Sequence, residues 1–153
     1  QIGNAAARAA FLAIAHAVEP YTVHHDSSTI AVRTPTGGVF IIVRSGDPDV
    51  RIQEQTGDSL RNRVAIELKG GTDYSNVHNR AGEAEKSHQK AKGSGYQECW
   101  TVIMTRGVDM AKLGSESPST DVWFDASQIL GREGPDWDWF RRHLYTVLGI
   151  QSL

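Results

Sequence analysis

Hydrophobic residues recur along the chain with two different periodicities, one typical of strands and the other of helices. The clearest strand pattern is Arg63 to Lys69, where every second side chain is apolar and would face a core. The intervening positions, which include Glu67 and Lys69, would share the opposite face. The same pattern predicts further strands at Thr29 to Arg33, Val39 to Arg44, Asp49 to Gln55, Cys99 to Met104 and Val122 to Phe124.

Three segments show helical spacing instead. We predict helices at Ala5 to Val18 with Asn4 as the N-cap, at Asn76 to Lys92, and at Trp137 to Leu148. The polar stretch through Ser115 to Pro118 is interpreted as a loop. The resulting order is helix, antiparallel strands, helix, strand, strand, helix. It predicts an α/β or α+β fold, with a central mixed sheet flanked by helices.

Composition narrows the class of protein. The 153 residues suffice for one domain, and no internal repeat suggests a second. No apolar run approaches the roughly 20 residues that a membrane span needs. Cys99 is the only cysteine, which excludes an intramolecular disulfide and fits a cytoplasmic location. The net charge of −2 requires any DNA-binding surface to be local. Because the chain begins at Gln1 and not at methionine, we expect a fragment or a processed product.

One group of residues carries candidate chemistry. Glu67 and Lys69 would project side by side from their strand, and Asp49 would open the preceding strand. If these strands pair as a hairpin, the two carboxylates converge, which is costly unless a cation lies between them. Carboxylate oxygens, together with the backbone carbonyl of Leu68, suit Mg²⁺. Lys69 would then lie near a water that attacks phosphorus in a phosphodiester.

Alternatives remain for several of these positions. Glu67 and Lys69 could instead be solvated residues on the polar face of a half-buried strand. Asp58 competes with Asp49 as the first acid, although it falls in a segment typical of a turn. Asp47 is a weaker competitor, and Glu83 is a further candidate acid near the metal.

The helix predicted from Asn76 carries basic side chains. Arg80, Lys86 and Lys90 are candidates for contact with the DNA backbone, where positive charge positions a duplex. The alternative is a solvated helix face with intrahelical ion pairs. His88 falls on the apolar face of this helix and is interpreted as a core residue.

The order Pro48-Asp49 followed by Glu67-Leu68-Lys69 resembles the PD-(D/E)XK nuclease signature. The segments Lys69 to Asp73, Asn79 to Ala91 and Cys99 to Val102 resemble type II restriction endonucleases of the XcyI-like family. The resemblance implies a restriction-endonuclease-like core in which Asp49 and Glu67 bind Mg²⁺ and Lys69 is the catalytic lysine. It also implies a homodimer that cuts double-stranded DNA at a specific sequence and leaves 5′-phosphate and 3′-hydroxyl ends.

Two other functions fit the same residues. A repair nuclease or junction resolvase on this core would recognise DNA structure and not a sequence. A catalytically silent DNA-binding module would keep the fold alone. The complete set of two acids and a lysine argues against the silent module, because such a protein would be free to lose any of the three.

Overall fold

The computed structural model describes residues 2–70 and 77–151. In chain order the elements are α1 (Ile2–Val18), the 3-10 helix η1 (Glu19–Tyr21), β1 (Thr22–His25), β2 (Thr29–Arg33), β3 (Val39–Arg44), β4 (Val50–Thr56), β5 (Ser59–Lys69), α2 (Val77–Gly93), β6 (Glu98–Ile103), α3 (Met110–Glu116), β7 (Val122–Asp125), α4 (Ala126–Gly131) and α5 (Pro135–Leu148). Within the described ranges, no helix is both long and apolar enough to cross a membrane.

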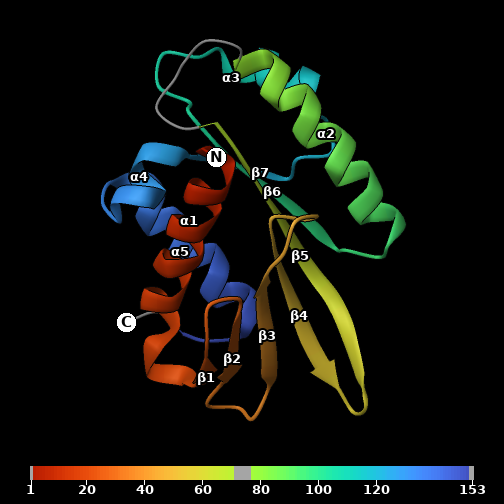
Figure 1. Ribbon diagram of the computed structural model, residues 1–153, viewed down its shortest axis with the longest axis vertical. Coiled ribbons are helices and arrows are strands. Elements are labelled where there is room, and N and C mark those ends of the chain that lie inside the picture. The colour runs from red at the N-terminus through yellow and green to blue at the C-terminus, as the bar shows by residue number, and fades with distance from the viewer. Residues whose placement is uncertain (1, 71–76, 152–153) are drawn as a thin grey trace.

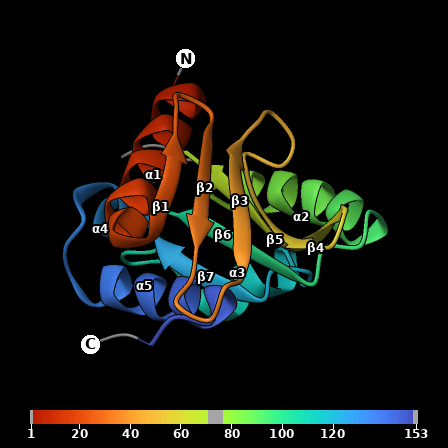
Figure 2. The ribbon, with the colours of Figure 1, turned by 90° about the horizontal axis from the view of Figure 1, so that it is seen from below.

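The strands form one mixed sheet in the order β1-β2-β3-β4-β5-β6-β7. Neighbouring strands are antiparallel from β1 to β5, whereas β5, β6 and β7 run parallel. Helices α1, α4 and α5 lie on one side of the sheet, and α2 lies on the other with α3 packed against it (Figures 1 and 2). The prediction of a mixed sheet flanked by helices is therefore confirmed.

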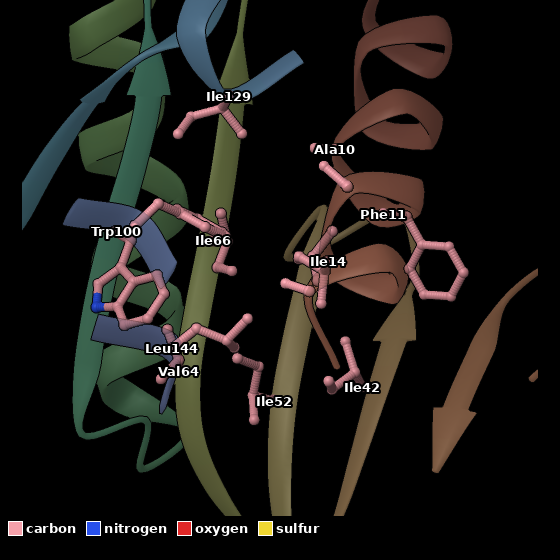
Figure 3. Close-up of a cluster of buried hydrophobic side chains, with 14 of the residues drawn as sticks. Ala10, Phe11, Ile14, Ile42, Ile52, Val64, Ile66, Trp100, Ile129 and Leu144 are labelled. Carbon is pink, nitrogen blue, oxygen red and sulfur yellow. The ribbon is translucent and has the colours of Figure 1, made fainter. Parts of the chain in front are cut away.

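The main core lies between the sheet and α1, α4 and α5. Ile14 of α1 points toward Ile42 and Ile66 of the sheet, and Trp100 packs beside Leu144 of α5 (Figure 3). Each of these side chains is almost fully buried, and burial of one such side chain stabilises the fold by roughly 1.5–3 kcal/mol.

The alternation of side chains predicted along β5 is confirmed, because alternate residues of this strand belong to hydrophobic clusters on opposite faces of the sheet. Val64, Ile66 and Leu68 join the core beneath α1, whereas Ala65 packs with Cys99 beneath α2. Since side chains alternate along a strand, Glu67 and Lys69 lie on the α2 side. The sheet thus presents its charged positions to the side of the molecule that α2 covers.

Several predicted boundaries needed correction. Strands β2 and β3 have the predicted bounds, but β5 begins at Ser59 because its first residues pair with β4 in an exposed hairpin. Helix α1 already begins at Ile2, so Asn4 lies inside the helix and is not its N-cap. Asn76, the predicted start of the second helix, lies outside the described residues.

Three short helices were not predicted as such: the 3-10 helix η1, α3 and α4. The stretch through Ser115, taken as a loop, belongs in part to α3, which Asp109 caps by accepting hydrogen bonds from two backbone N–H groups. Asp125 caps α4 by accepting a hydrogen bond from the backbone N–H of Gln128. Helices this short bury one or two side chains each, so they show no periodicity that a sequence pattern could reveal.

Candidate functional site

Asp49 and Glu67 meet at one end of the sheet. The pairing of Val50 with Ile66 brings the start of β4 beside the end of β5. The backbone N–H of Asp49 donates to Oε2 of Glu67 at 3.3 Å, and the N–H of Leu68 donates to Oδ2 of Asp49 at 2.9 Å. The sequence predicted that these two acids would converge if their strands paired as a hairpin. The strands do pair in this way, and the two acids lie side by side.

The turn that leads into β4 is fixed by its own hydrogen bonds. The Ser45 hydroxyl donates to the carbonyl of Pro48 at 2.8 Å, and the Ser45 N–H donates to the carbonyl of Asp49 at 3.0 Å. Arg51 donates to the same hydroxyl at 3.4 Å. Because these bonds flank Asp49, its backbone is held where its side chain meets β5.

Burial shapes the electrostatics of the pair. Glu67 is only 2% exposed, and burial, followed by the neighbouring Asp49 carboxylate, raises the pKa of Glu67 to about 7. Burial also raises the pKa of Asp49, against the opposing effects of the Leu68 N–H and the Lys69 ammonium. Nζ of Lys69 lies 3.5 Å from Oε1 of Glu67. The positive charge of one ammonium therefore faces two carboxyl groups, Glu67 buried and Asp49 half-buried. If both carboxyl groups ionise, a further cation would be needed to balance their charge.

The donor atoms fit a hard divalent cation. In a strand, the N–H and C=O of one residue point to the same neighbouring strand. Since the N–H of Leu68 points to Asp49, its carbonyl also lies on the Asp49 side. Nowhere in 2–70 or 77–151 do three or more His, Cys, Asp or Glu side chains group as a metal site. Two carboxylates and one carbonyl are enough for Mg²⁺, which proteins usually bind through one or two carboxylates together with water and phosphate.

The other candidate acids lie elsewhere. Asp58 is exposed in the turn that joins β4 to β5, at the opposite end of the hairpin from Glu67. Asp47 is half-exposed, and its carboxylate accepts a hydrogen bond from Nζ of Lys90 at 2.9 Å. Glu83 is exposed on α2 beside Lys86 and not on the face that packs against the sheet. Asp58 and Glu83 are not brought beside Glu67, whereas Asp47 lies close enough for its charge to raise the pKa values of Glu67 and Asp49 further.

The candidate DNA-backbone residues occupy different surroundings. Lys90, paired with Asp47, lines a groove of about 310 Å³ that also includes Arg51, Gln53 and Asn62 and begins beside Pro48. Arg80 is half-buried, with its guanidinium directly over Gly70 at the end of β5. Lys86 points outward from α2. Lys90 and Arg80 therefore flank the acid pair, whereas Lys86 does not.

A buried polar network beneath α2 was missed. His88 is fully buried, as predicted, and its Nε2 bonds to the hydroxyl of Thr101 at 2.8 Å. Hydroxyl contacts of 2.8 Å continue from Thr101 to Thr120 and on to Ser117, which donates to Glu85. The sequence signal that could have revealed this network is the spacing of Glu85. It lies four residues after the buried Ala81, and therefore on the buried side of the helix.

Glu85 is the centre of this network. Its carboxylate accepts hydrogen bonds from the backbone N–H and hydroxyl of Ser119, at 2.8 Å and 2.7 Å, and from the Gln89 amide at 2.9 Å. These bonds lower the pKa of Glu85 below its ordinary value, although its burial alone would raise it. The network ties α2 to the segment before β7 and fixes the helix over the sheet.

Comparison with known proteins gives one consistent result. The model of the XcyI restriction endonuclease family matches residues 1–151. Two curated relatives, the type II restriction enzymes Cfr9I of Citrobacter freundii and XcyI of Xanthomonas campestris pv. cyanopsidis, are each 47% identical to the chain over 126 residues. The match covers 82% of this chain but only 38% of the length of each relative. No solved structure matches the chain.

The family match spans nearly all of the chain and includes Asp49, Glu67 and Lys69. Its agreement with the two relatives confirms the resemblance drawn from the segments around β5 and α2. The chain belongs to the XcyI restriction endonuclease family.

Proposed function

We propose that this chain carries the catalytic core of a Mg²⁺-dependent, sequence-specific DNA endonuclease. The observation that carries the proposal is the convergence of the carboxyl groups of Asp49, directly before β4, and Glu67, on β5, with the Lys69 ammonium 3.5 Å from Glu67. A buried acid, a half-buried acid and a lysine at the end of a sheet have no evident value for stability, because burial of charged groups is costly. The same arrangement suits hydrolysis of a phosphodiester.

The proposed reaction is an in-line displacement. The oxygen of a water molecule bonds to phosphorus while the bond to the 3′ oxygen breaks, and its electron pair leaves with that oxygen. The water loses a proton to solvent, and the 3′ oxygen gains one, which leaves 5′-phosphate and 3′-hydroxyl ends. Lys69 would orient the water and favour its deprotonated form. Asp49 and Glu67, already fixed by hydrogen bonds, would hold the reacting groups in place.

A divalent ion would be held by the carboxylates of Asp49 and Glu67 and the carbonyl of Leu68. When bound, it would act as a Lewis acid and lower the pKa of water. The raised pKa values of both acids support this assignment, since carboxyl groups that resist ionisation together are stabilised by a cation between them.

Sequence specificity and assembly are part of the proposal. The relatives Cfr9I and XcyI are type II restriction enzymes, which supports double-stranded DNA as the partner and cleavage at a defined sequence. We further propose that the enzyme acts as a homodimer, so that one active site faces each strand. Since the chain spans 38% of each relative's length, elements that read bases would extend beyond the matched region.

A plasmid assay tests the proposal. The full-length protein and its Lys69→Ala variant are incubated with plasmid in Mg²⁺ or in chelator, and the products are separated by size and end-labelled. We expect discrete fragments that require both Mg²⁺ and Lys69, with ends that accept label only after the 5′ phosphate is removed. Fragments without discrete ends would favour a structure-specific nuclease. DNA binding without any cleavage would favour a catalytically silent module.

A further inference from the structure

Gly70 and Arg80 make an unusually close contact at the end of β5. A Cβ atom added to Gly70 would lie 2.2 Å from Nη1 of Arg80 and 2.9 Å from its guanidinium carbon. Real Cβ atoms do not approach other atoms so closely, so any side chain at position 70 would displace the guanidinium. Gly70 also has a φ of +82°, which residues other than glycine rarely adopt. The absence of a side chain at position 70 therefore gives Arg80 its place.

This place is next to the proposed catalytic residues. Gly70 follows Lys69 directly, so the guanidinium of Arg80 lies over the same end of β5 as the Lys69 ammonium. Arg80 comes from α2, whereas Lys69 comes from the sheet. Cationic side chains from two separate elements thus lie near the end of β5, Arg80 over Gly70 and Lys69 beside Glu67.

Helix α2 holds Arg80 firmly. Further along the same helix, His88 bonds to Thr101 of β6, and Glu85 accepts hydrogen bonds from Ser117 and Ser119. Both anchors are buried. A guanidinium on a fixed helix can act without reorganisation during the reaction, which is the condition under which a charged donor stabilises a transition state best.

We propose that Arg80 is a catalytic residue that contacts a non-bridging oxygen of the scissile phosphate. This inference rests on the proposed function. As water attacks, negative charge builds on the non-bridging oxygens, and a guanidinium supplies two parallel N–H donors that match them. Lys69 is assigned to the water, which leaves the non-bridging oxygens of the phosphate open to contact by a second cationic side chain. Gly70 serves this role indirectly, as the position that leaves room for the guanidinium.

A double-mutant cycle tests the inference. Single-turnover cleavage rates at saturating protein, and DNA affinity in chelator, are measured for wild type, Arg80→Ala, Gly70→Ala and the double variant. We expect Arg80→Ala to slow cleavage by about 10²–10³-fold with little change in affinity. Gly70→Ala should slow cleavage in the wild-type background but not in the Arg80→Ala background, where no guanidinium remains to displace.

Controls separate chemistry from folding. Arg8→Ala removes an exposed cation from α1, on the opposite side of the sheet, and should cleave at the wild-type rate. All rates are taken below the melting temperature of each variant, since alanine at a positive φ is destabilising. Arg80→Lys should recover only part of the rate, because an ammonium lacks the planar pair of donors.

Three results would overturn the inference alone: wild-type cleavage by Arg80→Ala, a loss confined to DNA affinity, or a Gly70→Ala effect that adds in full to that of Arg80→Ala. A wild-type protein that cleaves no DNA would overturn the proposed function, and this inference with it.

Discussion

The backbone N–H of Asp49 donates a 3.3 Å hydrogen bond to the side chain of Glu67, and the Asp49 carboxylate in turn accepts the N–H of Leu68 at 2.9 Å. Each acid is thus held by the strand that carries the other. This reciprocal arrangement, together with the pairing of β4 with β5, fixes two carboxyl groups side by side. Sites held by strands and supporting hydrogen bonds are more sharply positioned than sites on loops.

The raised pKa of Glu67 predicts a pH dependence of stability in the metal-free protein. The pKa rises from an ordinary value of 4.5 to about 7 in the folded chain, chiefly because the side chain is buried. The folded state therefore holds this proton more tightly than the unfolded state. The stabilising contribution of Glu67 is fully present below pH 4.5 and falls by about 3 kcal/mol as the pH rises through 7.

Glu67→Gln removes this titration. The unfolding free energies of wild type and variant are measured in urea with chelator present. We expect the wild type to lose stability relative to the variant as the pH rises from 4.5 to 7, and the difference to stay constant above pH 7. Using the difference removes the effect of His88, whose pKa burial lowers to about 4 and which therefore destabilises the fold in acid. A difference that is flat across this range would contradict the raised pKa.

Glu85 should matter for stability far more than its neighbour Glu83. Glu85→Gln keeps the shape of the side chain but weakens bonds to Ser117, Ser119 and Gln89, and we expect it to cost about 1–3 kcal/mol at pH 7. Glu83→Gln, on the exposed surface of the same helix, should change stability by less than about 0.5 kcal/mol. Chemical denaturation of both variants checks this, and equal effects would show that the network does not anchor α2.

Lys90 is expected to contribute to DNA binding and not to folding. Its ion pair with Asp47 is exposed, so Lys90→Ala should change stability by less than about 1 kcal/mol. If Lys90 contacts a phosphate, the variant should weaken DNA binding and reduce the slope of log affinity against log salt by about 1. Affinity measured at several salt concentrations, with Arg8→Ala as the reference, checks this. An unchanged slope would exclude a phosphate contact by Lys90.

The sequence predicted those parts of the site that depend on local pattern. Alternation along β5 placed Glu67 and Lys69 on one face. The turn-rich segment at Asp58 favoured Asp49 as the partner of Glu67, and Asp49 is the acid that contacts Glu67 in the structure. The close contact of Arg80 with Gly70 was not predictable, because it joins residues from a strand and a helix through three-dimensional packing. The Glu85 network likewise depends on Ser117 and Ser119, which lie in a segment without periodicity.

In the fold, too, the elements with a local sequence pattern were predicted and those that depend on packing were not. Strands β2 and β3 were found with the predicted bounds, because burial of one face imposes the alternation of apolar and polar residues. The alternation also placed the end of β5 correctly but not its start, because the first residues of β5 lie in an exposed hairpin. Helices α3 and α4 were missed, since each is capped by an aspartate and buries few side chains. Beyond the capping aspartate, these helices depend on the surface against which they pack.

The central claim is that Asp49 and Glu67 together bind a divalent ion, and Mn²⁺ titration followed by electron paramagnetic resonance tests it most directly. Wild type, Asp49→Asn, Glu67→Gln, Lys69→Ala and Asp58→Asn are compared above pH 7, where Glu67 ionises. We predict that Asp49→Asn and Glu67→Gln each weaken Mn²⁺ binding by at least about tenfold, since metal ligands must be deprotonated. Asp58→Asn and Lys69→Ala should bind Mn²⁺ as the wild type does. Unchanged binding by Asp49→Asn, or a loss with Asp58→Asn, would contradict the account.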